Sequence, residues 1–180
     1  MFGLFRKASS PRVDVVDKVW MSTEAKALAC AQMQEADPSC LFVAWFEETF
    51  DHVKEWISPE INNEVCLCLA TDPAVLNGKD RMIVFVEHYP LSGMEQQLFS
   101  KLGKNEIPVL SALDEPLFGL FGGGRIVGLM KKLGMKEDEM IGHSMVSKSI
   151  NNAQRKIANH IKVEKRARSP KEWFEINYKK

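Results

Sequence analysis

The 180-residue sequence lacks the features that define several protein classes. No apolar run approaches the ~20 residues that a membrane-spanning helix needs. The first residues reach Arg6 and Lys7 after only a few apolar positions, so the long apolar core of a secretory signal is missing. Only four cysteines occur, in irregular spacing, which is typical of reduced thiols rather than of a disulfide framework. We therefore expect a cytoplasmic protein with no membrane-spanning segment.

Motifs of the common enzyme classes are also absent. The sequence has no phosphate loop G-x-x-x-x-G-K-[ST], no G-x-S-x-G nucleophile elbow and no H-E-x-x-H zinc helix, and we predict no pair of carboxylates at strand ends. The glycine-rich stretch 122–128 does not have the G-x-G-x-x-G spacing and does not follow a buried strand, so we interpret it as a turn between helices. Nothing here predicts a catalytic residue, a cofactor or a metal ion.

The net charge of zero conceals a division of charge along the chain. Residues 1–121 contain 10 Lys and Arg against 18 Asp and Glu, whereas residues 122–180 contain 14 against 6. The two parts therefore carry net charges of −8 and +8. The simplest interpretation is that the basic part folds over the acidic part.

Short apolar runs alternate with helical patterns from residue 13 to about 113, which predicts an α/β domain with an open, mostly parallel, five-stranded sheet and helices on both faces. The predicted strands are 14–21, 40–46, 64–70, 82–86 and 107–110, and Pro108 places the last one near an edge. The predicted helices are 23–36, 47–57 and 92–102, with a single helical turn in 71–78.

Residues 114–180 have a purely helical pattern and form a predicted helical extension, while residues 1–12 are expected to be a flexible N-terminus. Short helices are predicted at 115–121, 125–133 and 171–178, and a long one from 144 to about 168. One narrow apolar face of the long helix, which we call the α7 seam, consists of Val146, Ile150, Ala153, Ile157 and Ile161. We expect the seam to pack on the acidic domain of the same chain, or to form a weak homodimer.

Two alternative functions depend on particular residues. Cys66 and Cys68, two apart on a predicted strand, could face His88 as a thiol or metal site, but an apolar run favours small buried side chains. The predicted long helix is basic and could follow nucleic-acid phosphates, although it carries no interleaved aromatic residues, so we do not expect nucleic-acid binding. Its basic residues are Lys148, Arg155, Lys156, Lys162, Lys165, Arg166 and Arg168.

Three segments resemble the SecA preprotein translocase motor. Residues 116–135 (PLFGLFGGGRIVGLMKKLGM) are similar to L-M-x-x-F-G-x-x-R-V-x-x-x-M-x-K-L-G-M, and residues 139–146 and 150–157 are similar to the motifs that follow it. More weakly, residues 17–26 resemble the entry to the second RecA-like motor domain, with 41–46 as its next strand. The resemblance extends over residues 14–163 and implies a RecA-like helicase second lobe followed by the start of the helical scaffold.

The departures from SecA affect its ATPase motifs. The first motor lobe, which supplies the phosphate loop, has no counterpart in the sequence, and A-T-N-M-A-G-R-G-T-D is replaced by residues 70–79 (ATDPAVLNGK). The motif Q-L-R-G-R-A-G-R-Q-G aligns with residues 97–106, so Lys101 and Lys104 stand where the resemblance implies arginine fingers. We therefore expect a stand-alone, non-enzymatic relative without a cofactor. Its expected role is a protein-interaction or regulatory module whose partner is a translocase motor or a preprotein.

Overall fold

The structure is a computed structural model and describes residues 12–57, 66–78, 80–120, 122–142 and 144–178. The strands are β1 (Asp14–Trp20), β2 (Leu41–Ala44), β3 (Leu67–Leu69), β4 (Ile83–Phe85) and β5 (Glu106–Ala112). The helices are α1 (Thr23–Ala36), α2 (Glu47–Trp56), α3 (Ala74–Asn77), α4 (Ser92–Phe99), α5 (Pro116–Gly119), α6 (Gly123–Lys132), α7 (Ser144–His160) and α8 (Pro170–Asn177). The predicted flexible segment 1–12 lies outside the described residues except for Arg12.

The five strands form one open sheet in the order β1-β5-β4-β2-β3, and all four pairings are parallel. This confirms the predicted fold class. The edge position predicted from Pro108 is wrong, because β5 lies between β1 and β4. The pairing of β5 with β4 is limited to Phe85 and Val109, so this inner strand tolerates a residue that cannot donate a backbone hydrogen bond.

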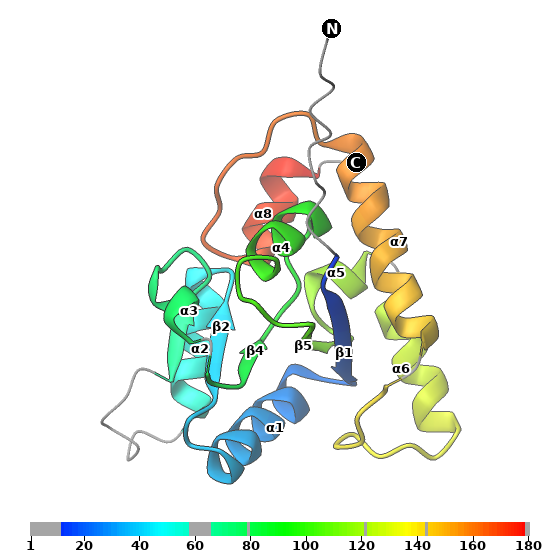
Figure 1. Ribbon diagram of the computed structural model, residues 1–180. Coiled ribbons are helices and arrows are strands. Elements are labelled where there is room, and N and C mark those ends of the chain that lie inside the picture. The colour runs from blue at the N-terminus through cyan, green and yellow to red at the C-terminus, as the bar shows by residue number, and fades with distance from the viewer. Residues whose placement is uncertain (1–11, 58–65, 79, 121, 143, 179–180) are drawn as a thin grey trace, which may run out of the picture.

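Alternate side chains of the inner strands pack on opposite faces of the sheet. In β2, Leu41 and Val43 contact the apolar cluster beneath α3 and α4, whereas Phe42 and Ala44 contact the cluster beneath α1 and α2. All four are buried, as the uninterrupted apolar sequence predicts for a strand covered on both sides. Helices therefore cover both faces of the sheet, with α1 and α2 on one face and α3 and α4 on the other (Figure 1).

Local sequence signals fix the ends of two helices. The Ser22 hydroxyl accepts a hydrogen bond from the N–H of Ala25 and so starts α1, which ends before Asp37 and Pro38. Ser169 starts α8 in the same way through the N–H of Glu172, and Pro170 occupies the first helical position. Both helices begin within one residue of the predicted positions.

The long basic helix ends eight residues earlier than predicted, at His160. Residues 161–169 are not helical, and side chains of this segment contact both the α/β domain and α8. Glu164 accepts hydrogen bonds from the Tyr89 hydroxyl and, at 2.7 Å, from Trp173 Nε1, and Arg168 Nε donates to Glu47 at 2.7 Å. These contacts turn the chain back toward the sheet, so the basic residues do not form one continuous helical array.

The helical extension packs on the α/β domain through a third apolar cluster. It joins Val19, Phe46 and Leu113 of the domain to residues of α5, α7 and α8. Trp173 of α8 is completely buried there. Between the two oppositely charged parts, Glu47 pairs with Arg166 and Arg168. In the described part of the chain, no helix is both long and apolar enough to cross a bilayer.

Candidate functional site

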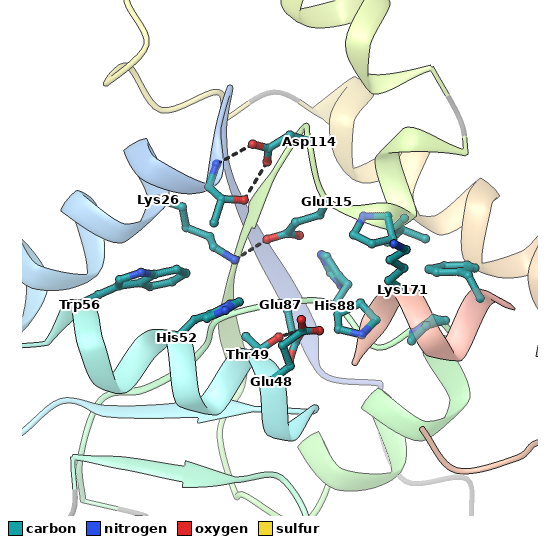
Figure 2. A pocket seen from close by; sticks show the side chains of 16 residues that line it. Lys26, Glu48, Thr49, His52, Trp56, Glu87, His88, Asp114, Glu115 and Lys171 are labelled. Atoms are coloured by element: carbon teal, nitrogen blue, oxygen red, sulfur yellow. Dashed lines mark hydrogen bonds and ion pairs between the residues drawn. The ribbon is translucent and has the colours of Figure 1, made fainter. Parts of the chain in front are cut away.

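The connections of β2 and β4 define the point at which an open α/β sheet usually binds a ligand. Helix α2 leaves β2 toward one face and α4 leaves β4 toward the other, although the two strands are neighbours. The carboxyl ends of two such strands leave a crevice between their loops. A cavity of about 270 Å³ opens here, on the side of α1 and α2. We call it the switch-point cavity (Figure 2).

Lys26 of α1 lies at the bottom of this cavity and is buried. Its ammonium group donates to the carbonyl oxygen of Val86 at 2.7 Å and forms an ion pair with the carboxylate of Glu115. The ammonium also lies 5.6 Å from the centre of the Trp56 ring, a cation–π distance. Burial lowers the pKa of Lys26, but Glu115 outweighs that effect and raises it above its ordinary value.

Glu87 follows β4 and is also buried. Its Oε1 accepts hydrogen bonds from the backbone N–H groups of Trp45 at 2.9 Å and Phe46 at 3.0 Å, and its Oε2 accepts one from the Thr49 hydroxyl at 2.7 Å. The carboxylate therefore occupies the N-terminal end of α2, where backbone donors and the helix dipole attract an anion. Burial raises the pKa of Glu87 to about 7, despite these hydrogen bonds.

The walls of the cavity come from segments far apart in the sequence. Asp114, after β5, accepts hydrogen bonds from the Thr23 N–H at 3.0 Å and the Thr23 hydroxyl at 2.9 Å, and so connects β5 to the start of α1. Lys171 and Phe174 of α8 close another side. Figure 2 shows carboxylates and amines from different segments of the chain around one space.

Two of the groups in this cavity that could hold an anionic ligand, the Lys26 ammonium and the N-terminal end of α2, already bind carboxylates of the chain itself. Glu115 pairs with Lys26, and Glu87 covers the N-terminal end of α2. A phosphate would have to displace these buried carboxylates, which are held by one ion pair and several hydrogen bonds. The arrangement thus stabilises the loops and disfavours a bound phosphate.

A second buried network adjoins the switch-point cavity on the side of α4 and α7, and we call it the His88 cluster. The ring of His88 hydrogen bonds to Asp17 through Nε2 and to Glu95 through Nδ1, both at 2.9 Å. Gln154 of α7 donates to the other oxygen of Glu95 at 2.9 Å and to the carbonyl of Tyr89 at 2.8 Å. Burial lowers the pKa of His88, but Glu95 and Asp17 outweigh it and raise the pKa to about 10. The cluster therefore holds β1, α4 and α7 together with a charged imidazolium.

The structure corrects the sequence analysis at two places in this region. Carboxylates do follow neighbouring strands, with Glu87 close to the end of β4 and the pair Asp114 and Glu115 close to the end of β5. Asp114 and Glu115 were not assigned to a strand end because β5 was predicted to end at residue 110, whereas it continues to Ala112. The buried apolar run 109–113 was the signal that could have revealed this.

The cysteines do not form a site with His88. Cys66 precedes β3 and packs in the cluster beneath α1 and α2, whereas Cys68 packs in the cluster on the other face. The expectation that both face the same side is therefore wrong, since Cys66 lies outside the strand and does not follow its alternation. Burial raises the pKa of the Cys68 thiol to about 11. The described residues contain no group of three or more His, Cys, Asp or Glu able to hold a metal ion.

The two lysines at the implied arginine-finger positions lie away from the switch-point cavity. Lys101 and Lys104 follow α4 and precede β5, at the amino edge of the sheet. The side chains around the cavity come from the carboxyl edge. Along the α7 seam, the structure buries Ile150, Ala153 and Ile157 in the third apolar cluster, while Val146 and Ile161 pack partly against it.

Three of the known proteins that this chain resembles share one name, protein translocase subunit SecA. The chain is 40% identical over 82 residues to protein translocase subunit SecA of Desulfotalea psychrophila, 39% over 87 residues to that of Acinetobacter baylyi and 43% over 79 residues to that of Acidithiobacillus ferrooxidans. A substantial part of this chain is SecA-like. These matches cover 42–46% of the chain but only 9–10% of the SecA proteins. No model of a known protein family matches the chain. The open parallel sheet is consistent with the RecA-like fold that the resemblance to SecA implies.

Proposed function

We propose that this chain is a non-catalytic SecA-like protein that takes part in preprotein translocation as an interaction or regulatory module in the cytoplasm. The observation that carries the proposal is the occupation of the switch-point cavity by the chain's own carboxylates. Glu115 neutralises Lys26, and Glu87 accepts the backbone hydrogen bonds at the start of α2. Because these groups are engaged, we propose that the chain acts through its surfaces and not through a phosphate site.

The relatives supply the biological context of the proposal. They are named protein translocase subunits, and the similarity extends over nearly half of this chain. Lys101 and Lys104, which stand where the resemblance implies arginine fingers, lie at the opposite edge of the sheet from the switch-point cavity. A lysine also cannot form the bidentate contact of arginine with a phosphate, and both points support the absence of catalysis. We propose a full-length translocase motor or a preprotein as the partner.

Titration calorimetry with ATP and magnesium, together with a phosphate-release assay, tests the catalytic part of the proposal. We expect neither micromolar binding nor turnover, with a full-length SecA motor as the positive control under the same conditions. The variant Glu115→Gln is a useful comparison, because it frees the ammonium of Lys26 and should increase anion binding if occupation by Glu115 is what excludes it. Turnover of ATP by the unmodified chain would refute the proposal.

Analytical ultracentrifugation tests the partner. A fluorescently labelled chain is mixed with the purified SecA motor or with an unfolded preprotein, and its sedimentation coefficient is measured. We expect a faster species with one of these two components and not with serum albumin. Unchanged sedimentation with both would contradict a role in translocation through direct contact.

A further inference from the structure

β1 is an edge strand whose backbone groups alternate between β5 and the open side. The N–H of Asp14 donates to the carbonyl of Asn105 at 3.0 Å, and the carbonyl of Trp20 accepts from the N–H of Leu113 at 2.9 Å. The even-numbered residues therefore pair with β5. In a strand, the backbone groups of the residues between them point to the other side. The odd-numbered residues of β1 thus face the open edge.

The chain covers both ends of this open edge with its own groups. Val19 exchanges two hydrogen bonds with Ile141, of 3.4 and 2.7 Å, in an antiparallel bridge. Val13 places its N–H and its carbonyl against the side-chain amide of Gln96, each at 3.0 Å, which imitates a strand partner.

The positions between these two ends are open. Within the part of the chain that the structure describes, the backbone groups of Val15 and Asp17 on this edge make no hydrogen bond. The side chain of Asp17 is engaged by His88, but its backbone is not. Two residues of an edge strand are therefore left with donors and acceptors of correct spacing for a further strand.

A groove of about 310 Å³ lies along these open positions, between β1 and α7. We call it the β1–α7 groove. Val15 and Asp17 line one side, and Ser147 and Asn151 of α7 line the other. In Figure 1, α7 runs beside β1 at this edge of the sheet. At one end of the groove, the guanidinium of Arg12 donates a hydrogen bond to the side-chain oxygen of Asn151 at 3.2 Å.

We propose that the β1–α7 groove binds an extended peptide segment of a protein partner, which adds to β1 as a short antiparallel strand. The bridge between Val19 and Ile141 shows that this edge of β1 accepts an antiparallel partner. The peptide main chain supplies two N–H and two carbonyl groups to Val15 and Asp17. The same edge of a second copy does not fit, since α7 lies beside β1 in both copies.

This inference rests on the protein-interaction part of the proposed function and names the chemistry of one contact. It does not depend on whether the chain hydrolyses ATP or takes part in translocation. Because the peptide probe contains no SecA or preprotein sequence, the two proposals can fail separately.

The probe is the uncharged peptide acetyl-Thr-Ala-Thr-Ala-Thr-amide, added to the ¹⁵N-labelled chain up to millimolar concentration. We expect the amide signals of Val15 and Asp17 to shift and their hydrogen exchange to slow about tenfold or more, as protection by a hydrogen bond requires. The amide of Val19 is already bonded and should keep its exchange rate. The same peptide with every amide N-methylated cannot donate and should not bind.

Two variants locate the contact. Val15→Pro removes an outward N–H without touching the ladder to β5, and should weaken binding about tenfold or more. Ser147→Trp fills the groove from α7 and should have the same effect, while Ser149→Trp on the exposed side of α7 is the matched control. Circular dichroism checks folding, and if Val15→Pro does not fold, Ser147→Trp alone decides. Absent shifts at Val15 and Asp17, equal binding of the methylated peptide, or equal effects of the two tryptophan variants would each overturn the proposal.

Discussion

Lys26 and Glu115 form a partly buried ion pair in the switch-point cavity, although 89 positions separate them in the sequence. The pair connects α1 to the loop after β5, and its ammonium also reaches the carbonyl of Val86 after β4. Three segments of the carboxyl edge are thereby fixed to one side chain. The first prediction concerns this pair.

Lys26→Met should lower the free energy of unfolding by about 3 kcal/mol or more, because it leaves the carboxylate of Glu115 buried without a counter-charge. Urea denaturation measures the loss. The double variant Lys26→Met with Glu115→Leu should recover most of it, since both charges are then removed. Lys54→Met, at an exposed position of α2, is the control and should change stability by less than about 0.5 kcal/mol. A loss no larger than that of the control would contradict the importance of the pair.

Glu87 should make stability depend on pH between about 4.5 and about 7. Its pKa in the folded chain is raised to about 7, so the folded state holds a proton that the unfolded state has already released. The free energy of unfolding should therefore fall as pH rises through this range. In Glu87→Gln, which keeps the hydrogen-bonding shape of the side chain, this part of the dependence should disappear. Parallel pH profiles of the two proteins, from denaturation at each pH, would show that the prediction is wrong.

His88 should make the free energy of unfolding depend on pH above about 6.5. Its pKa is raised to about 10 by Glu95 and Asp17 against the effect of burial, so its stabilising contribution is complete below about 6.5. That contribution is lost as pH rises toward about 10, and the loss should amount to a few kcal/mol. In Asp17→Asn the loss should begin at lower pH, because one of the two carboxylates that hold the proton is gone. NMR titration of the His88 ring gives its pKa directly, and an ordinary value near 6.5 would contradict this account.

Ile150→Ala and Ile157→Ala should each lower the free energy of unfolding by about 2–5 kcal/mol, because both side chains are buried in the third apolar cluster. The sedimentation coefficient should stay the same, since the seam packs on its own chain in the structure. Val163→Ala is the control, because Val163 is 80% exposed. A shift from dimer to monomer in the isoleucine variants would instead place the seam between two copies of the chain.

Much of the α/β domain follows from local sequence. The start of α1 at Ser22 and its end before Asp37 and Pro38 could be predicted, because capping and helix-breaking residues act within one turn. The continuous apolar run in β2 indicated a strand buried on both faces. The end of β5 was predicted two residues too early, at 110 instead of Ala112. No turn residue separates the strand from Leu113, which is also buried.

The candidate sites could not be predicted to the same extent. The sequence of α1 does not distinguish Lys26 from an exposed lysine, yet its side chain is almost completely buried. His88 was considered only beside Cys66 and Cys68, whereas its partners are Asp17, 71 positions away, and Glu95. A charged side chain can be buried only where an opposite charge meets it, and that partner is set by the order of the strands.

The sequence by itself determined the class of fold, the succession of strands and helices along the chain, and the resemblance to SecA. Apolar periodicity and capping are properties of neighbouring residues. The tertiary structure alone decided that β5 is an inner strand, that α7 ends at His160, and that Glu87 and Glu115 occupy the switch-point cavity. Each of these depends on pairing between distant segments. Their free energy comes from contacts formed only when the sheet is assembled, so no local pattern encodes them.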